Sequence, residues 1–311
     1  MNLFNLFKIV LKVPNFLFIK KILRHEIPIE DFDYSISKKQ LYLKRLKVSV
    51  HKDKNLFVLN GYNLIINLIE KCNAQIISSD DGLLIKIDNL KFNINYWDEL
   101  NILKEVFVDG IYNYVINENM SLIDIGMNVA ITSLFFAKND KIEKIYAFEP
   151  FPKTFNYAIK NIELNNHLAH KIIPRNYGLD KENQFLDVKY IVENKGSVGV
   201  KGIPKDLLAT YKSNIQIERI ELRSGLNEIK TILNENPYSN FIAKIDCEGS
   251  EYVIIDELHE KKVLRRIKVF IIEWHEKGPS QIIKTLNVNG FDVFSFGDCN
   301  KDVGMIYAFR K

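Results

Sequence analysis

The amino-acid sequence predicts an α/β protein built on a mostly parallel sheet. Short apolar runs, typical of buried parallel strands, alternate with segments whose apolar residues recur at helical spacing. Two of these runs lead to acidic residues, Asp124 and Glu149. Because ligands of open α/β sheets bind outside the carboxyl ends of the strands, we expect the functional site where these runs end.

The stretch SLIDIGMNVA, residues 121–130, joins an expected strand to an expected helix at 131–137. A strand that turns sharply into a helix needs a residue without a Cβ atom at the bend, and Gly126 provides one where a ligand can approach the backbone. This arrangement is typical of nucleotide-binding sites. The alternative is an ordinary strand, turn and helix in which Asp124 is incidental.

The next apolar run, residues 145–148, ends in Glu149 and Pro150. Pro150 stops the strand and leaves the carboxylate of Glu149 at its carboxyl end. An acid roughly twenty residues after a glycine turn can hold ribose hydroxyls. Asp124 and Glu149 are therefore candidate ligand contacts.

The glycine pattern departs from the dinucleotide-binding fingerprint. G-x-G-x-x-G would require glycines where the chain has Asn128 and Ile131. The chain lacks the glycines that would let its backbone approach a pyrophosphate closely, and this argues against a nucleotide-dependent oxidoreductase. An adenosine ligand without phosphates fits better, and S-adenosylmethionine (SAM) is the common one.

Four blocks carry a more specific signal: DIGMNVA at 124–130, AFEP at 147–150, NIELN at 161–165 and KIDCEGSE at 244–251. In this order and at these spacings they resemble the FkbM-type family of SAM-dependent methyltransferases, over roughly residues 90 to 311. The resemblance implies a class I (Rossmann-like) methyltransferase sheet, with SAM as methyl donor and usually a hydroxyl as acceptor.

The resemblance also implies a donor site. Asp124, Gly126 and Asn128 match the family's first SAM-binding block, and Glu149 matches the acid that binds the ribose. The expected donor-binding residues are Asp124, Gly126, Met127, Asn128, Glu149, Pro150 and Asp180.

Two positions depart from the family's pattern. Met127 stands where a small residue is usual, and Ala130 replaces a glycine. A non-catalytic member that keeps the fold as an interaction module therefore stays open as an alternative.

Length and composition indicate a folded protein with an appended segment. At 311 residues and 47% hydrophobic, the chain can bury a large α/β core. Its three cysteines, at 72, 247 and 299, are widely separated, which favours a reducing, cytoplasmic setting. The expected parts are 1–37, a basic, apolar helical arm and linker; 38–96, an α+β extension; and 97–311, the methyltransferase domain.

Positive charge is concentrated at the N-terminus. Residues 1–50 hold ten Lys or Arg against four acids, whereas the whole chain has a net charge of +4, so the main body is not expected to bind nucleic acid. Residues 1–24 contain no acid, and Lys8, Lys12 and Pro14 interrupt their apolar run, which argues against a signal peptide or a spanning helix. Two interpretations remain for 1–24. They form an arm packed on the main domain or on a second subunit, or they contact the inner face of the membrane peripherally.

The remaining elements follow from periodicity. The segments before the central strand are expected as short strands within 41–59, a helix at 62–71, strands at 83–87 and 91–95, and a helix over 100–111. A helix at 153–165 and a third strand at 172–173 follow Glu149. Asp180, in the exit loop of that strand, is placed where a side chain commonly contacts adenine, although it also fits a plain turn.

Residues 184–240 form a longer excursion, which we expect to shape the acceptor side of the site. Its expected elements are strands at 185–192 and 215–222, a flexible segment at 194–199 and a helix at 226–233.

The second polar strand end is FIAKIDCEGSE, residues 241–251. Because strand side chains alternate between faces, Lys244, Asp246 and, if the strand persists, Glu248 are expected to point toward the ligand. A carboxylate there could accept the proton of an acceptor hydroxyl. Several together could hold a divalent cation, which we do not favour, or they could bind only the donor amine or loop amides.

The run VFIIEWH, residues 269–275, ends in further polar groups. His275 could act as a general base oriented by Glu273, or could merely be packed. Strands at 291–296 and 304–309, joined by a loop at 297–302, are expected to close the sheet as an antiparallel hairpin.

We therefore expect a SAM-dependent methyltransferase that methylates a hydroxyl on a sugar, glycan or secondary metabolite. Its expected catalytic residues are Asp246, Glu248 and His275, and its expected partner is a small-molecule or glycan acceptor. An N-methyltransferase would have the same donor site and stays open.

Overall fold

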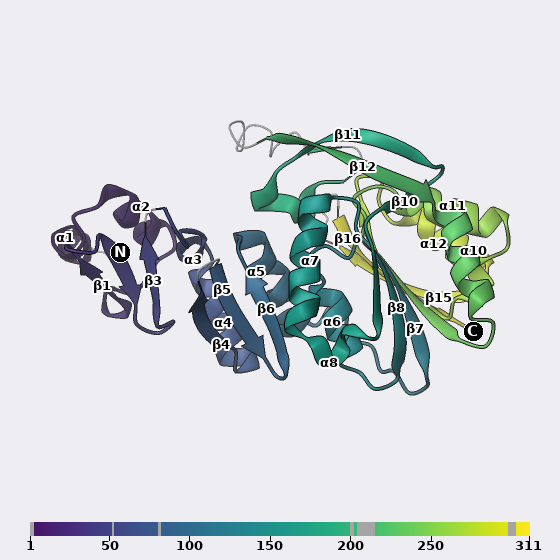
Figure 1. Ribbon diagram of the computed structural model, residues 1–311, viewed down its shortest axis with the longest axis horizontal. Coiled ribbons are helices and arrows are strands. Elements are labelled where there is room, and N and C mark those ends of the chain that lie inside the picture. The colour runs from purple at the N-terminus through teal and green to yellow at the C-terminus, as the bar shows by residue number, and fades with distance from the viewer. Residues whose placement is uncertain (1–2, 52, 80–81, 200–201, 204–214, 298–302) are drawn as a thin grey trace. The chain divides into compact units, whose positions relative to one another are not determined.

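The computed structural model describes residues 3–51, 53–79, 82–199, 202–203, 215–297 and 303–311. The chain divides into two compact units, Met1–Ile111 and Tyr112–Lys311 (Figure 1). Residues 97–111, expected to begin the larger domain, belong by their contacts to the first unit. The hairpin loop expected at 297–302 lies almost wholly outside the described residues, and so does Cys299.

The first unit consists of helices and antiparallel strands, arranged around two three-stranded sheets. In β5, Leu83, Ile85 and Ile87 are buried while Leu84 and Lys86 are half-buried, the alternation expected of a sheet with one covered face. The elements are α1 (Leu3–Lys12), α2 (Phe16–Arg24), β1 (Phe32–Ser35), β2 (Gln40–Leu43), β3 (Val48–His51), α3 (Phe57–Asn60), α4 (Tyr62–Cys72), β4 (Gln75–Ser79), β5 (Gly82–Ile87), β6 (Leu90–Ile94), α5 (Trp97–Leu103) and a π-helix (Lys104–Asp109).

The second unit is organised around a seven-stranded sheet of order β15-β16-β14-β13-β7-β8-β9. The strands from β14 to β9 are all parallel, and β16 runs antiparallel to both β14 and β15. The mostly parallel sheet with an antiparallel C-terminal pair is therefore confirmed. Its strands are β7 (Met120–Ile125), β8 (Ile142–Phe148), β9 (Ile172–Arg175), β13 (Asn240–Ile245), β14 (Val269–His275), β15 (Phe291–Gly297) and β16 (Val303–Arg310).

Strand order reverses between β7 and β13. From β7 the chain moves outward to β8 and β9, and then returns to place β13 and β14 on the other side of β7. In open α/β sheets, the crevice outside the strand ends at such a reversal is where ligands bind. The topology thus points to the carboxyl ends of β7, β8 and β13.

Helices cover both faces of this sheet. Ile123 and Ile125 of β7 face one layer, where they share a buried core with Ala243, Ile245 and residues of α10 (Gly225–Glu235), α11 (Glu251–Glu260) and α12 (Ser280–Val288). The intervening residue Asp124 faces the other layer and is hydrogen-bonded from α6 (Ile131–Ala137). The helices α7 (Pro152–Leu164) and α8 (Asn166–Ala169) follow β8.

The excursion forms a separate small sheet of order β10-β12-β11. β11 pairs antiparallel with β12, and β10, which was expected as a loop, pairs parallel with β12. The segment expected to be flexible, 194–199, overlaps a 3₁₀-helix, Val192–Ser197. The strands are β10 (Gly178–Asp180), β11 (Gln184–Tyr190) and β12 (Gln216–Ser224). Among the helices of the described residues, none combines the length and apolar character needed to cross a bilayer.

Candidate active site

A cavity lies at the carboxyl ends of β7, β8 and β13, where the strand order reverses. Counting the open solvent at its mouth, the empty space is about 580 Å³. The lining residues come from the ends of these strands and from the excursion: Ile125, Gly126, Asn128, Phe148, Glu149, Pro150, Phe151, Gly178, Leu179, Lys195, Gly196, Val198, Gly199, Asp246, Cys247, Glu248 and Ser250.

Gly126 occupies a position that only glycine can take. Its φ is +85°, and a Cβ atom there would lie 1.7 Å from the carbonyl oxygen of Asp246. The amide groups of Gly126 and Met127 both donate to the Phe148 carbonyl oxygen, at 3.1 and 2.8 Å. The loop after β7 is thereby held between the ends of β8 and β13, with its backbone at the cavity.

Glu149 links the loops that follow β7 and β8. One carboxylate oxygen accepts from the amide of Asn128 and the other from the amide of Phe151, both at 3.0 Å. The side chain is 5% exposed, and this burial raises its pKa to about 7, although the two amides oppose the shift. Each carboxylate oxygen keeps a second lone pair for a ligand.

Two buried polar atoms of the lining have no hydrogen-bond partner in the described part of the chain. They are Oδ1 of Asn128 and Oγ of Ser250. Buried polar groups in proteins are nearly always satisfied, so these atoms are suited to meet a polar ligand. Asn128 also has φ +51°, a left-handed conformation that asparagine tolerates better than most residues.

Asp124 does not line the cavity. It is fully buried and pairs in register with Lys244 of β13, whose Nζ lies 3.2 Å from one Asp124 oxygen, while Ser133 Oγ donates to the other at 2.5 Å. Lys244 also lies 3.4 Å from Asp246. Burial alone would lower the pKa of Lys244, but the charges of Asp124 and Asp246 raise it, so the ammonium stays charged.

Two other expected donor contacts also lie away from the lining. Met127 is buried beside Gly126 without lining the cavity, and Asp180 lies at the end of β10, where Gly178 and Leu179 line it instead. Pro150 lines the cavity as expected. The roles assigned to these residues from the sequence stay predictions.

Glu248 was expected to share the direction of Lys244 and Asp246 only if the strand persisted, and the strand ends at Ile245. Glu248 has φ +54°, so strand alternation does not reach it. Lys244 turns into the protein toward Asp124, whereas Asp246 and Glu248 line the cavity. The two acids therefore reach the site from a loop.

His275 is oriented by Glu251, which sequence reasoning did not assign to that task. A Glu251 oxygen accepts from the His275 amide at 2.9 Å and lies 3.3 Å from its Nδ1. On the other side of the ring, Nε2 is 3.7 Å from a Glu248 oxygen. The sequence signal for this residue is an acid in the first turn of a helix, since Glu251 opens α11. In the structure, its second oxygen accepts from the amide of Gly249.

The pKa values distinguish the two candidate bases. Burial alone would lower the pKa of His275, but the Glu251 hydrogen bond and the Glu248 charge raise it to about 10. Burial raises the pKa of Glu248 to about 7, with the cationic His275 opposing the shift. His275 therefore carries a proton at neutral pH. Glu248, which lines the cavity, titrates in the working range of a general base.

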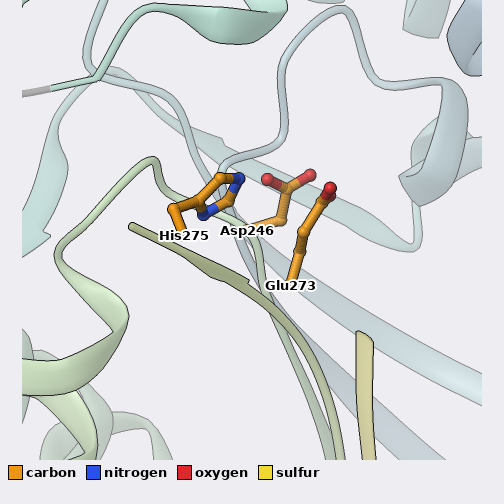
Figure 2. Close-up of side chains that lie close together, drawn as sticks. All are labelled: Asp246, Glu273 and His275. Carbon is orange, nitrogen blue, oxygen red and sulfur yellow. The ribbon is translucent and has the colours of Figure 1, made fainter. Parts of the chain in front are cut away.

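Figure 2 shows the side chains of Asp246, Glu273 and His275 lying close together; Asp246 follows β13, and the other two belong to β14. Their donor atoms lie within 4.8 Å of one another, and a carboxylate, carboxylate and imidazole set can hold a divalent cation. Asp246 is already ion-paired with Lys244, and the raised pKa of His275 keeps its ring protonated. A metal cation would therefore compete with the Lys244 ammonium for Asp246 and with the proton on His275.

Comparison with known proteins identifies the family. Residues 124–293 match the family model described as the methyltransferase FkbM domain, so the chain belongs to the FkbM methyltransferase family and is a methyltransferase with the predicted class I fold. These residues include all four blocks in full.

Individual relatives are distant. Methyltransferase sdnD of Sordaria araneosa is 24% identical over 233 residues, covering 68% of this chain and 89% of that protein. Methyltransferase 1 of Beauveria bassiana is 24% identical over 169 residues, covering 51% and 67%. The crystal structure of methyltransferase FkbM from Methylobacillus flagellatus has a TM-score of 0.42 at 11% identity, covering 82% of this chain and 60% of that one.

Proposed function

We propose that the cavity binds SAM and that the protein transfers the methyl group to a hydroxyl of a sugar, glycan or secondary metabolite. One observation carries this proposal: a single cavity is lined both by Glu149, the acid after β8, and by Asp246 and Glu248, the acids after β13. A donor held at the first acid would present its reactive end to the others. The proposed partner is thus a small-molecule or glycan acceptor.

In this proposal, Glu149 accepts hydrogen bonds from the ribose hydroxyls. Gly126 lets the backbone approach the ligand, and the unsatisfied Oδ1 of Asn128 offers a further acceptor. Asp124 acts indirectly, by holding Lys244 and with it the loop whose Gly126 carbonyl accepts from the Lys244 ammonium. Pro150 contributes its apolar surface to the lining.

The donor arrives activated, because its sulfonium carries a positive charge. The protein must align the acceptor oxygen and take its proton, since the new oxygen–carbon bond forms as the sulfur–carbon bond breaks. We assign proton acceptance to Glu248, which faces Asp246, Glu251, Glu276 and His275. The His275 cation, held by Glu251, limits the rise of the Glu248 pKa, and Asp246 helps to orient the acceptor.

Two alternatives differ in what they would bind. An N-methyltransferase would use the same donor site with an amine as acceptor. A non-catalytic member would bind no donor, an idea suggested by Met127 and Ala130. Because Met127 is buried away from the cavity lining, its bulk supports this second alternative less than the sequence alone suggested.

Two observations support a proposal for the compartment and the substrate class of the reaction. Cys72 and Cys247 are free thiols, which fits a reducing cytoplasm. The excess positive charge lies in residues 1–50 and not in the unit that holds the cavity, so we do not propose a nucleic-acid substrate.

Calorimetric titration with S-adenosylhomocysteine, the demethylated donor, tests donor binding. We expect the wild type and Glu248→Gln to bind alike, and Glu149→Ala to lose binding about tenfold or more, because it removes a hydrogen-bonded charge. A wild type that does not bind would end the enzyme proposal. Equal binding by Glu149→Ala would remove Glu149 from its role. Comparing glycans and metabolites from cells with and without the gene would identify the acceptor.

A further inference from the structure

The two N-terminal helices, α1 and α2, pack on the first unit through one face. Ile9 and Val13 of the α1 segment and Phe18 and Ile22 of α2 are buried. The Phe18 ring meets Tyr34 edge-on, with ring centroids 6.0 Å apart. These contacts account for the inner face of the two helices.

The outer face of the same helices is apolar and exposed. Phe7 is 63%, Leu11 69% and Phe16 81% exposed. Phe7 and Leu11 are four residues apart and so lie on one side of α1, opposite the buried Ile9 and Val13. Single exposed apolar side chains are common, but a set gathered on one arm marks an interaction surface.

Exposed cations lie beside Phe16 on α2. Lys20 and Arg24 are exposed and lie four and eight residues after Phe16, on the same side of α2. Lys8 is also exposed, whereas two other bases of residues 1–24 contact the protein: Lys12 donates to the Ile29 carbonyl at 2.9 Å, and Lys21 donates to Asn60. Residues 1–24 contain no Asp or Glu, so no acid of the arm offsets the outward charge.

We propose that the outer face of α1 and α2 lies on the surface of an anionic lipid bilayer. Phe7, Leu11 and Phe16 would enter the boundary between headgroups and acyl chains. Lys20 and Arg24 would stay at the headgroups, where long basic side chains reach anionic lipids. This contact is peripheral, since neither helix is long enough to span.

The charge of the outer face of α1 and α2 favours contact with a membrane over contact with a second copy of the chain. A symmetric dimer interface places the same patch against itself. The patches that carry Lys20 and Arg24 would then be opposed, and residues 1–24 offer no acid to pair with them. Like charges opposed in this way disfavour association, whereas an anionic surface complements them.

Sedimentation of the full-length chain with lipid vesicles tests the proposal. We expect binding to phosphatidylcholine vesicles that contain phosphatidylglycerol, weakened by added salt, and little binding to phosphatidylcholine alone. The triple variant Phe7→Ser, Leu11→Ser, Phe16→Ser should lose about tenfold or more of this affinity, because its apolar anchor is gone. Its unfolding temperature should stay near that of the wild type, since the three side chains are exposed.

A matched triple variant controls for lost apolar surface in general. Phe185, Ile217 and Phe294 are comparably exposed in the second unit, and replacing all three by Ser should leave vesicle binding unchanged.

A pair of charge reversals tests the basic component. Lys20→Glu with Arg24→Glu should abolish the preference for anionic vesicles. Lys38→Glu with Lys39→Glu, which are exposed but outside the arm, should lower it far less.

Three outcomes would overturn the proposal. They are no wild-type binding to anionic vesicles, equal binding to neutral and anionic vesicles, and unchanged binding by the arm triple variant. If ultracentrifugation instead shows a dimer that only the arm variant dissolves, with no vesicle binding, the face is a subunit interface. Donor binding is measured separately and does not affect this test.

Discussion

A Cβ atom on Gly126 would lie 1.7 Å from the carbonyl oxygen of Asp246, so the loops after β7 and β13 meet backbone to backbone. The Asp246 amide also donates to the Ile125 carbonyl oxygen at 3.0 Å, which extends the pairing of the two strands into these loops. The loop that carries the proposed acceptor acids is therefore fixed against the loop of the proposed donor site. A substitution in one of these loops should therefore alter the conformation of the other.

The first prediction concerns Gly126→Ala, with Gly290→Ala as its matched control. The two glycines have nearly the same φ, +85° and +86°, but Gly290 has open space around its missing Cβ. The control should lose about 1–2 kcal/mol of unfolding free energy, the cost of a left-handed residue, and keep S-adenosylhomocysteine binding. Gly126→Ala should lose about 3 kcal/mol or more and also binding. Equal effects of the two changes on stability, measured by denaturant unfolding, would contradict the described contact.

The second prediction concerns the buried pair of Asp124 and Lys244. Lys244→Met should cost about 3–5 kcal/mol of unfolding free energy, because it leaves the fully buried Asp124 without its partner. The double variant Asp124→Asn, Lys244→Met removes both charges and should be less destabilised than Lys244→Met alone. A Lys244→Met protein within about 1 kcal/mol of the wild type would show that the pair is unimportant for folding.

The third prediction is a pH dependence that originates at Glu149. Its pKa in the folded protein is raised by burial to about 7, so the folded state favours the protonated form. Stability from this group is present below the ordinary carboxyl pKa and is lost as the pH rises through about 7. Relative to Glu149→Gln, the wild type should lose about 2 kcal/mol of unfolding free energy between about pH 5 and 8.

Denaturant unfolding of both proteins across this range measures that difference. The nearby charges of Asp124 and Lys244 are present in both, so they cancel in the comparison. Parallel pH profiles of the two proteins would remove Glu149 as the source.

The fourth prediction separates Glu251 from Glu273 as the residue that positions His275. The pKa of His275 is raised to about 10, with the Glu251 hydrogen bond as the largest raising influence and Glu273 among the smaller ones. By imidazole NMR, Glu251→Gln should lower this pKa more than Glu273→Gln does. The reverse order would restore Glu273 to the role first expected. The raised pKa of His275 adds stability below about pH 6.5, which is lost as the pH rises through about 10.

The fifth prediction concerns metal removal. Lys244 and the protonated His275 already offset Asp246, so we expect chelation with EDTA to leave methyl transfer unchanged once an acceptor is known. Loss of activity on chelation, restored by Mg²⁺ or Mn²⁺, would instead assign a cation to Asp246, Glu273 and His275. Calorimetric titration of the chelated protein with Mn²⁺ provides a second readout that needs no acceptor.

Much of the sheet was predictable, because the strands are nearly continuous apolar runs and the helices keep a regular apolar period. The acids at the strand ends were found for the same reason. Asp124 shows where this reasoning stops: alternation places it on the face toward α6, and its partner Lys244 is 120 residues away in the chain. Sequence position alone does not show which strands become neighbours.

Loops account for most of the remaining differences. The direction of Glu248 depended on whether the strand persisted, and the chain leaves β13 at Ile245, with Glu248 in a left-handed conformation. The excursion supplies Gly199, whose missing Cβ would lie 2.4 Å from Cβ of Glu248, a contact between segments that no local pattern reveals. Turn residues set the direction of such segments, and tertiary contacts decide what they touch.

A crystal structure with S-adenosylhomocysteine bound tests the central claim most directly. We predict that the ribose hydroxyls lie within hydrogen-bonding distance of the Glu149 carboxylate, with the sulfur directed toward Glu248. A ligand bound elsewhere on the protein, or a ribose turned away from Glu149, would contradict it.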